Sequence, residues 1–173
     1  DMAARLAPEL EIRFAALCHD LGKGTTPAEI LPSHRGHEER SVAMLEAVCD
    51  RFRIPNRCRE LARITARYHG LVHKVEELRP ATILDLIEGA DGLRRPERFR
   101  QMLTACEADF RGRTGYAERD YPQGAILGRL LDAVLGVDAG SIAREAADTT
   151  KIPEHLRAAR VQALRAARSS ASP

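Results

Sequence analysis

Histidine and aspartate side chains are concentrated in the first part of the 173-residue chain, and they are its most informative feature. His19 and Asp20 are adjacent, and Gly22-Lys23-Gly24 follows them. An imidazole nitrogen beside a carboxylate oxygen forms a mixed donor set of the kind that divalent metal ions bind. Five of the six histidines lie between positions 19 and 73, namely His19, His34, His37, His69 and His73. The pattern favours a metal site over a core histidine beside an exposed aspartate.

The segment that must position His19 and Asp20 is a predicted helix from Glu9 to Leu21, because apolar residues recur there at helical intervals. Its predicted buried stripe is Leu10, Phe14, Leu17, Cys18 and Leu21. The glycines that follow favour a helix end, so His19 and Asp20 fall in the last turn. That turn carries a partial negative charge, which makes a carboxylate unfavourable there unless a cation is near.

The remaining segments are also predicted to be helical. A loop from Gly22 to Gly36 holds His34 and leads to a helix that begins near His37. The next helix is predicted to end at His69-Gly70, and the helix that Pro80 opens places Asp91 on the same buried face as Ile87. Further helix starts are expected at Pro96, Pro122, Asp138 and Pro153. The sequence therefore predicts one all-α domain of about seven to eight helices over residues 1–168, with a disordered tail at 169–173.

Composition places the chain among ordinary globular proteins and excludes several other classes. No Cys-x-x-Cys pair occurs among the four cysteines, so a structural zinc framework is not expected, and the cysteines are predicted to be buried, reduced thiols. No apolar run is long enough to span a membrane, and the first residues lack the pattern of a signal peptide. These features predict a cytoplasmic protein without a membrane partner.

Arginine supplies most of the positive charge of the chain, whose net charge is only +2. From Lys151 onward there are five basic residues and one acidic residue, which gives that segment a charge of +4. Guanidinium groups suit bidentate contacts to phosphate. The candidate RNA-binding and phosphate-binding residues are Arg111, Arg113, Arg157 and Arg160, although a solvated basic helix face explains the same pattern.

Several motifs together resemble a known family. They are the stretch from Arg13 to Gly24, the segments 34–37, 55–56, 69–73 and 120–123, and Asp91. These residues resemble the C-terminal HD domain of the bacterial multifunctional CCA-adding tRNA nucleotidyltransferases, within the HD superfamily of metal-dependent phosphohydrolases. The superfamily pattern is a His, then His-Asp, then a distant Asp. His19-Asp20 match the doublet and Asp91 matches the distant Asp.

The resemblance implies a compact helical HD domain with phosphatase, 2′-nucleotidase and 2′,3′-cyclic phosphodiesterase activities, beside CCA addition to tRNA. The implied cofactor is a divalent metal ion, Mg²⁺, Ni²⁺ or Mn²⁺, and the implied ligands are His19, Asp20 and Asp91. No His precedes His19 and no nucleotidyltransferase motif is present. We therefore expect an N-terminally truncated piece of a longer enzyme, whose partners are tRNA, nucleotide phosphoesters and the missing nucleotidyltransferase region.

The remaining polar residues receive roles in phosphoester hydrolysis. Lys23 is expected to contact the substrate phosphate, and His34, His37 and His69 are expected to position water or transfer protons. His73 and His155 are predicted to be surface residues. Two other hypotheses stay open, namely an RNA-contacting module and a structural domain, each catalytically silent. A monomer and a homodimer are equally compatible with the sequence.

Overall fold

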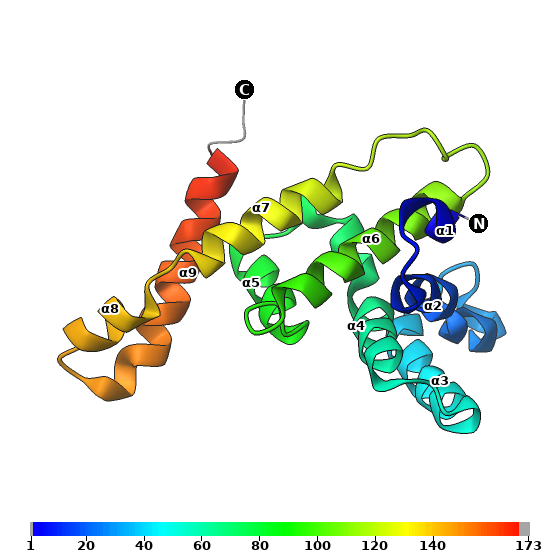
Figure 1. Ribbon diagram of the computed structural model, residues 1–173, viewed down its shortest axis with the longest axis horizontal. Coiled ribbons are helices and arrows are strands. Elements are labelled where there is room, and N and C mark those ends of the chain that lie inside the picture. The colour runs from blue at the N-terminus through cyan, green and yellow to red at the C-terminus, as the bar shows by residue number, and fades with distance from the viewer. Residues whose placement is uncertain (1, 170–173) are drawn as a thin grey trace.

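The computed structural model describes residues 2–169 as a set of packed helices (Figure 1). No β-strand occurs within these residues, which confirms the predicted all-α fold class. The α-helices are α1 (Met2–Leu6), α2 (Leu10–Cys18), α3 (His37–Phe52), α4 (Asn56–His73), α5 (Pro80–Gly89), α6 (Pro96–Gly112), α7 (Gln123–Leu135), α8 (Ala139–Glu145) and α9 (Ile152–Ser169). Short 3₁₀ helices are η1 (Leu21–Thr25), η2 (Ala28–Ile30), η3 (Val75–Glu77) and η4 (Thr149–Lys151).

Helix α4 is the centre of the N-terminal half, where it packs against α2, α3 and α6. Its apolar residues follow helical spacing around one broad face, and this face is buried. The buried residues of α4 are Cys58, Leu61, Ala62, Ile64, Thr65, Ala66, His69 and Val72. His69 is therefore part of the interior of the protein and not of a surface loop.

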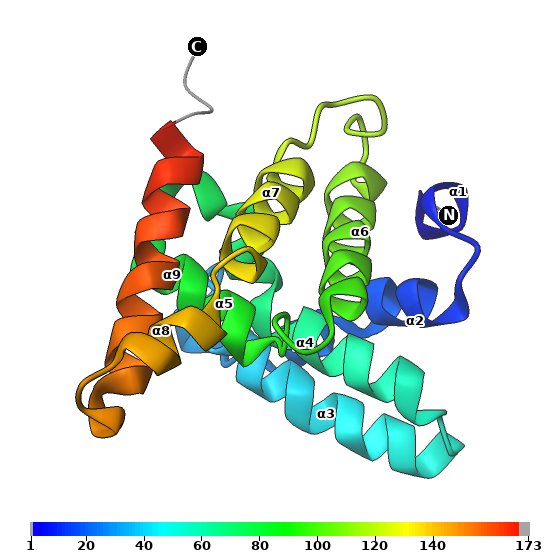
Figure 2. The same cartoon turned by 60° about the vertical axis from the view of Figure 1, so that its left-hand side comes forward.

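The C-terminal half is built around α7, which lies between α6 and α9 (Figure 2). Leu127 and Leu131 of α7 and Leu164 of α9 are fully buried, and they join this half to the same core. Asp138 caps α8 as predicted, because its Oδ1 accepts a hydrogen bond from the backbone N–H of Ser141 at 2.9 Å. None of the helices among residues 2–169 is sufficiently long and apolar to cross a membrane.

The buried face of α2 differs from the predicted stripe. Ile12, Ala15 and Cys18 are buried, whereas the side chains of Leu10 and Leu17 are 55% and 78% exposed. Helix α2 packs against α4 and α6, and the small Ala15 permits that close approach. The predicted stripe is therefore confirmed for Cys18 and wrong for Leu10 and Leu17, while Phe14 and Leu21 are partly buried against the core.

Two further boundaries were predicted incorrectly. Helix α4 continues through Gly70 to His73, because the cost of about 1 kcal/mol for a glycine inside a helix is small beside the burial of Val72 in the next turn. Ser169 is the last residue of α9, and residues 170–173 of the predicted disordered tail lie outside the described residues. The four cysteines are free and buried, as predicted.

Candidate metal centre

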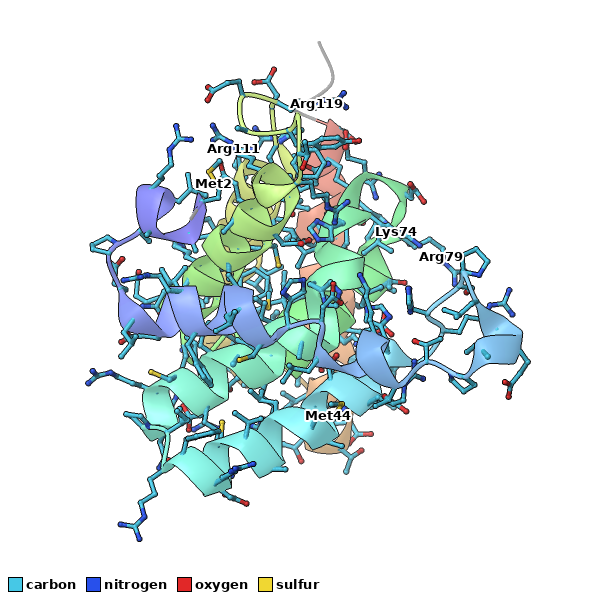
Figure 3. All side chains as sticks on the ribbon, turned by 90° about the vertical axis from the view of Figure 1, so that its right-hand side faces the viewer. Met2, Met44, Lys74, Arg79, Arg111 and Arg119 are labelled. Carbon is cyan, nitrogen blue, oxygen red and sulfur yellow. The ribbon has the colours of Figure 1, made fainter. Side chains whose placement is uncertain are left out.

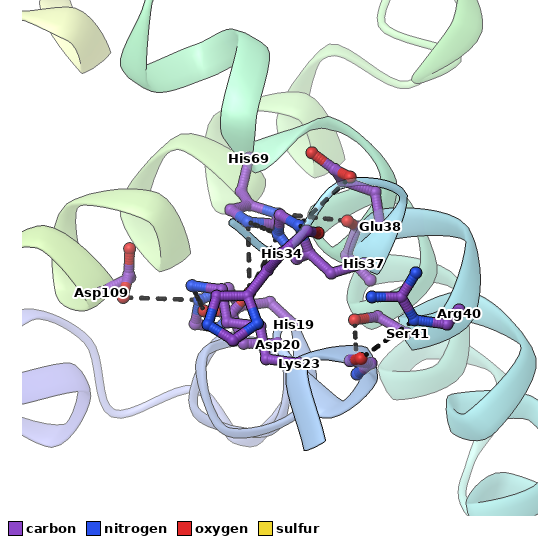
Figure 4. A network of polar contacts seen from close by, with 12 residues as sticks. His19, Asp20, Lys23, His34, His37, Glu38, Arg40, Ser41, His69 and Asp109 are labelled. Atoms are coloured by element: carbon purple, nitrogen blue, oxygen red, sulfur yellow. Dashed lines mark hydrogen bonds and ion pairs between the residues drawn. The ribbon is translucent and has the colours of Figure 1, made fainter. Parts of the chain in front are cut away.

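Four elements bring a cluster of imidazole and carboxylate groups together (Figure 4). His19 and Asp20 directly follow the last residue of α2, and His37 is the first residue of α3. His69 comes from the interior of α4, and Asp109 comes from the last turns of α6. Residues up to 90 positions apart in the sequence therefore contribute to one site.

Asp20 lies at the centre of this cluster and contacts four partners. Its Oδ1 is 3.2 Å from His37 Nε2 and 3.4 Å from His69 Nε2. Its Oδ2 is 3.2 Å from His19 Nε2 and 2.6 Å from Lys23 Nζ. The two oxygens of one carboxylate therefore face three imidazole rings and an ammonium group.

Each of the three imidazoles is oriented by a backbone carbonyl close to it in the sequence. His19 Nδ1 lies 2.9 Å from the carbonyl oxygen of Ala16, and His37 Nδ1 lies 2.9 Å from that of His34. In the interior of α4, His69 Nδ1 lies 3.1 Å from the carbonyl oxygen of Ala66. Because a carbonyl oxygen only accepts hydrogen bonds, each Nδ1 carries a proton, and each ring turns its Nε2 toward Asp20.

The arrangement of these atoms fits a bound divalent cation. His37 Nε2 and His69 Nε2 are 3.2 Å apart, so two lone pairs face one another when both rings are neutral. His19 Nε2 and Asp20 Oδ1 are buried without a hydrogen-bond partner among the described residues. Candidate ligand atoms of His19, Asp20 and His69 lie within 4.8 Å of one another. Nitrogen and oxygen donors that converge without pairing are typical of ligands around a metal position.

The charges of the site favour a cation as well. Burial raises the pKa of Asp20, but contacts with His19, His69 and Lys23 outweigh it and hold that pKa well below its usual range. Burial likewise acts against ionisation of Asp109, and His19 and His73 keep its pKa well below the usual range. Burial lowers the pKa of His19, yet the neighbouring carboxylates of Asp109 and Asp20 raise it to about 9. Two ionised carboxylates thus share one pocket and attract positive charge.

Asp109 is the residue of the cluster that the sequence analysis missed. Its Oδ1 lies 3.4 Å from His19 Nε2, and its side chain is only 16% exposed. The available signal was its position three residues after Cys106, which is fully buried on α6. A carboxylate one helical turn from a core residue needs a partner in the interior.

The structure does not bring Asp91, the predicted third metal ligand, into the cluster. Helix α5 ends at Gly89, and Asp91 has a left-handed backbone conformation with φ of 57°. The helical spacing that placed Asp91 on the face of Ile87 therefore stops before residue 91. Its carboxylate contacts guanidinium groups instead, with Oδ2 at 3.1 Å from Arg98 and longer contacts to Arg94 and Arg95.

Replacing Asp91 by asparagine should leave metal affinity within about twofold of the wild-type value, because its ion pairs with Arg94, Arg95 and Arg98 include no residue of the cluster. Calorimetric titration of Mn²⁺ into both proteins measures this. A fall in Mn²⁺ affinity as large as that expected for the loss of a ligand would show that Asp91 binds the metal.

The other histidines occupy different positions. His34 Nδ1 lies 2.7 Å from Thr26 Oγ1 in the connection between α2 and α3, while the His34 carbonyl orients His37. His73 was predicted to be a surface residue, and this is wrong, because its side chain is 20% exposed and lies between Asp109 and Tyr121. His155 is exposed, as predicted.

The four candidate RNA-binding arginines are engaged in contacts within the protein. Each guanidinium contacts a carboxylate, and the pairs are Arg111 with Glu107, Arg113 with Asp109, Arg157 with Asp85 and Glu88, and Arg160 with Glu88. Figure 3 shows Arg111 at the end of α6 and Arg119 on the connection that follows it. Exposed ion pairs are weak, so these contacts neither support nor contradict the RNA-contacting hypothesis, which stays a prediction.

A close approach of η1 to α3 holds the two halves of the cluster together. The backbone N–H of Gly22 donates to Ser41 Oγ at 2.9 Å, and Arg40 Nε donates to the Gly22 carbonyl at 3.2 Å. A Cβ at position 22 would overlap the carbonyl oxygen of His37 and lie 2.5 Å from the backbone nitrogen of Ser41. Only glycine fits this contact, which fixes Asp20 relative to His37.

Comparison with known proteins relates the chain to a described family. The HD domain family matches residues 1–133. The chain is 56% identical over 163 residues to the Multifunctional CCA protein of Thioalkalivibrio sulfidiphilus, which covers 94% of this chain and 40% of that protein. It is 54% identical over 165 residues to the protein of the same name from Dechloromonas aromatica, at 95% and 40% coverage.

A third relative extends the match over almost the whole chain. The Multifunctional CCA protein of Laribacter hongkongensis is 49% identical over 172 residues, which are 99% of this chain and 42% of that protein. The chain thus spans about two fifths of the length of the curated relatives it matches. No solved structure matches it. With a His-Asp doublet at the centre of its polar cluster and a family match over residues 1–133, the chain belongs to the HD domain family.

Proposed function

We propose that this chain is a metal-dependent phosphohydrolase domain that acts on 2′,3′-cyclic phosphodiesters, 2′-nucleotides and phosphomonoesters. The observation that carries the proposal is the convergence of three imidazole Nε2 atoms on the Asp20 carboxylate in one largely buried cluster. Membership of the HD domain family supports it. Mixed nitrogen and oxygen ligands suit Mg²⁺, Mn²⁺ and Ni²⁺, and the donor set does not select one of them.

His19, Asp20 and His69 are the proposed ligands. Asp109 is proposed as the further carboxylate ligand, the role that the sequence analysis gave to Asp91. His37 is adjacent to the same oxygen of Asp20 as His69 and is available to the metal or to a coordinated water. When bound, the divalent ion supplies a polarised phosphoryl oxygen and a water of lowered pKa. The protein fixes the positions of these donors before the ion arrives.

Residues around the ligands complete the proposed chemistry. The Lys23 ammonium is 39% exposed beside Asp20, so a phosphate that reaches the cluster meets a positive charge there. His37 keeps its proton on Nδ1 against the His34 carbonyl, and its Nε2, which lies beside Asp20 Oδ1, would accept a proton from water. His34 lies in the connection that borders this side of the cluster and is proposed to exchange protons with the substrate.

The biological context follows from the names of the relatives. We propose that the domain belongs to a longer multifunctional CCA protein, where it works beside a nucleotidyltransferase region and acts on phosphate groups at tRNA 3′ ends. Hydrolysis of a 2′,3′-cyclic phosphate would open the ring to a phosphomonoester and one hydroxyl. Hydrolysis of that phosphomonoester would release inorganic phosphate and leave both hydroxyls free for nucleotide addition. The 2′-hydroxyl of RNA makes this substrate class distinct from DNA.

The experiment that tests the proposal combines metal binding with hydrolysis. We expect Mn²⁺ or Ni²⁺ to bind in calorimetry and 2′,3′-cyclic AMP to be hydrolysed only when metal is added. Removal of metal by a chelator should abolish hydrolysis and lower the melting temperature, because the ion binds the folded state. Metal binding without hydrolysis of cyclic or terminal phosphates would reject the substrate assignment, and no binding would reject the metal centre.

A further inference from the structure

We propose that Tyr121 and His73 are positioning residues that hold the Asp109 carboxylate in its orientation toward the metal centre. This inference rests on the proposed metal site. The geometry is a continuous chain of polar contacts that runs from the Tyr121 hydroxyl through both nitrogens of His73 to Asp109 and then to His19. It connects the loop between α6 and α7 to the cluster.

The distances define two linked hydrogen bonds and one longer contact. Tyr121 Oη lies 2.9 Å from His73 Nδ1, and His73 Nε2 lies 3.1 Å from Asp109 Oδ2. The other oxygen, Asp109 Oδ1, lies 3.4 Å from His19 Nε2. Asp109 therefore uses one oxygen for support and turns the second oxygen toward the cluster.

The two terminal groups, the Asp109 carboxylate and the Tyr121 hydroxyl, determine which atom donates in each hydrogen bond. The ionised carboxylate of Asp109 only accepts, so His73 donates from Nε2. His73 Nδ1 then carries the lone pair and accepts the proton of the Tyr121 hydroxyl. One hydroxyl therefore fixes the tautomer and the orientation of His73, and His73 fixes the Asp109 carboxylate, as outer hydrogen-bond partners do for metal ligands.

A second support of Asp109 is weaker. Arg113 Nη2 lies 2.9 Å from Asp109 Oδ2, but its side chain is 52% exposed, compared with 20% for His73. Exposed ion pairs are screened by solvent and contribute little. The less exposed His73 therefore provides most of the orientation.

The chain offers a matched control in the same loop. Tyr116 and Tyr121 both pack their rings against Phe110, with centroid distances of 5.2 Å and 5.0 Å. Within residues 2–169 the Tyr116 hydroxyl has no hydrogen-bond partner, whereas the Tyr121 hydroxyl reaches His73. Tyr121→Phe and Tyr116→Phe therefore remove the same atom from rings at similar distances from Phe110, and only the first breaks the chain.

The test measures Mn²⁺ affinity by calorimetry, together with the tautomer of His73 by nitrogen-15 NMR of the metal-free protein. Tyr121→Phe should weaken Mn²⁺ binding about tenfold, the low end of the 10–100-fold range for such outer partners. Tyr116→Phe should stay within about twofold of the wild type. His73→Gln, which keeps an N–H donor for Asp109, should retain more affinity than His73→Leu. The wild-type spectrum should show the proton of His73 on Nε2, and Tyr121→Phe should show a mixture of tautomers.

Contrary outcomes are distinct. Equal Mn²⁺ affinity in Tyr121→Phe and the wild type would overturn the positioning role, and so would an equal loss in Tyr116→Phe, since that result assigns the effect to loop packing. If the wild type binds no Mn²⁺, the proposed metal site fails. The NMR measurement then tests the two hydrogen bonds of His73 independently of metal binding. A His73 proton on Nδ1 would contradict the proposed hydrogen bonds.

Discussion

Replacing Asp20 by asparagine is expected to weaken metal binding by more than about 100-fold, beyond the range for residues that only support a ligand, and to reduce phosphodiester hydrolysis to background. Asp20 supplies both oxygens that face His19, His37 and His69. Asparagine keeps the size of the side chain but replaces one oxygen by an NH₂ group, which cannot bind a cation. The measurements are calorimetric titration with Mn²⁺ and hydrolysis of 2′,3′-cyclic AMP.

The Asp20→Asn protein should remain folded, because Asp20 contributes charge to a site and little apolar area to the core. A far-ultraviolet circular dichroism spectrum like that of the wild type would verify this. Asp91→Asn is the matched control, since it removes one carboxylate of equal size away from the cluster. Wild-type Mn²⁺ affinity in Asp20→Asn would show that Asp20 is not a ligand.

Replacing Gly22 by alanine should lower the free energy of unfolding by about 2–3 kcal/mol, the upper part of the range for inserting atoms into a packed interior. The new methyl group would overlap the His37 carbonyl oxygen at the start of α3, and backbone atoms cannot rotate away. For a chain of this length, such a loss corresponds to a fall in melting temperature of roughly 4–12 °C. Metal affinity should fall too. A shift of η1 away from α3 would move Asp20, which directly precedes η1, away from His37, the first residue of α3.

Gly24→Ala provides the control for this substitution. Gly24 belongs to the same 3₁₀ helix, and among the described residues no atom lies within 4 Å of a Cβ built there. Its melting temperature should change by less than about 2 °C, since a methyl group in open space has only backbone-entropy effects. Similar melting temperatures for Gly22→Ala and Gly24→Ala would mean that η1 moves freely against α3.

The sequence contained enough information to predict the fold class and most of the cluster. Helical spacing and Pro or Gly at the ends of segments located most of the helices, because these signals act within a few residues. His19 and Asp20 were recognised as a pair for the same reason, and His37 was correctly placed at a helix start. Local chemistry was therefore predictable wherever neighbouring residues decide it.

The errors concern contacts between distant segments. Asp91 and Asp109 both follow apolar residues at helical spacing, but α5 ends before Asp91, whereas the packing of α6 against α2 brings Asp109 to His19. The burial of His73 likewise depends on Tyr121, which is 48 residues away. Leu17 was assigned to the core by its helical spacing, although packing against α4 buries Ala15 and leaves Leu17 exposed. Pairings of this kind are set by tertiary structure and have no local pattern.

The hydrogen bonds that orient the imidazoles join residues close in sequence, so they tolerate substitutions elsewhere in the protein. Each Nδ1 bonds to a carbonyl three or four residues earlier, as His19 does with Ala16 and His69 with Thr65 and Ala66. A backbone acceptor exists whatever side chain occupies its position, so the nitrogen that each ring presents is set by the nearby backbone. Substitutions in the surrounding core can change the spacing between ligands by small steps without changing their protonation. The site can therefore drift gradually in affinity while its donor atoms stay the same.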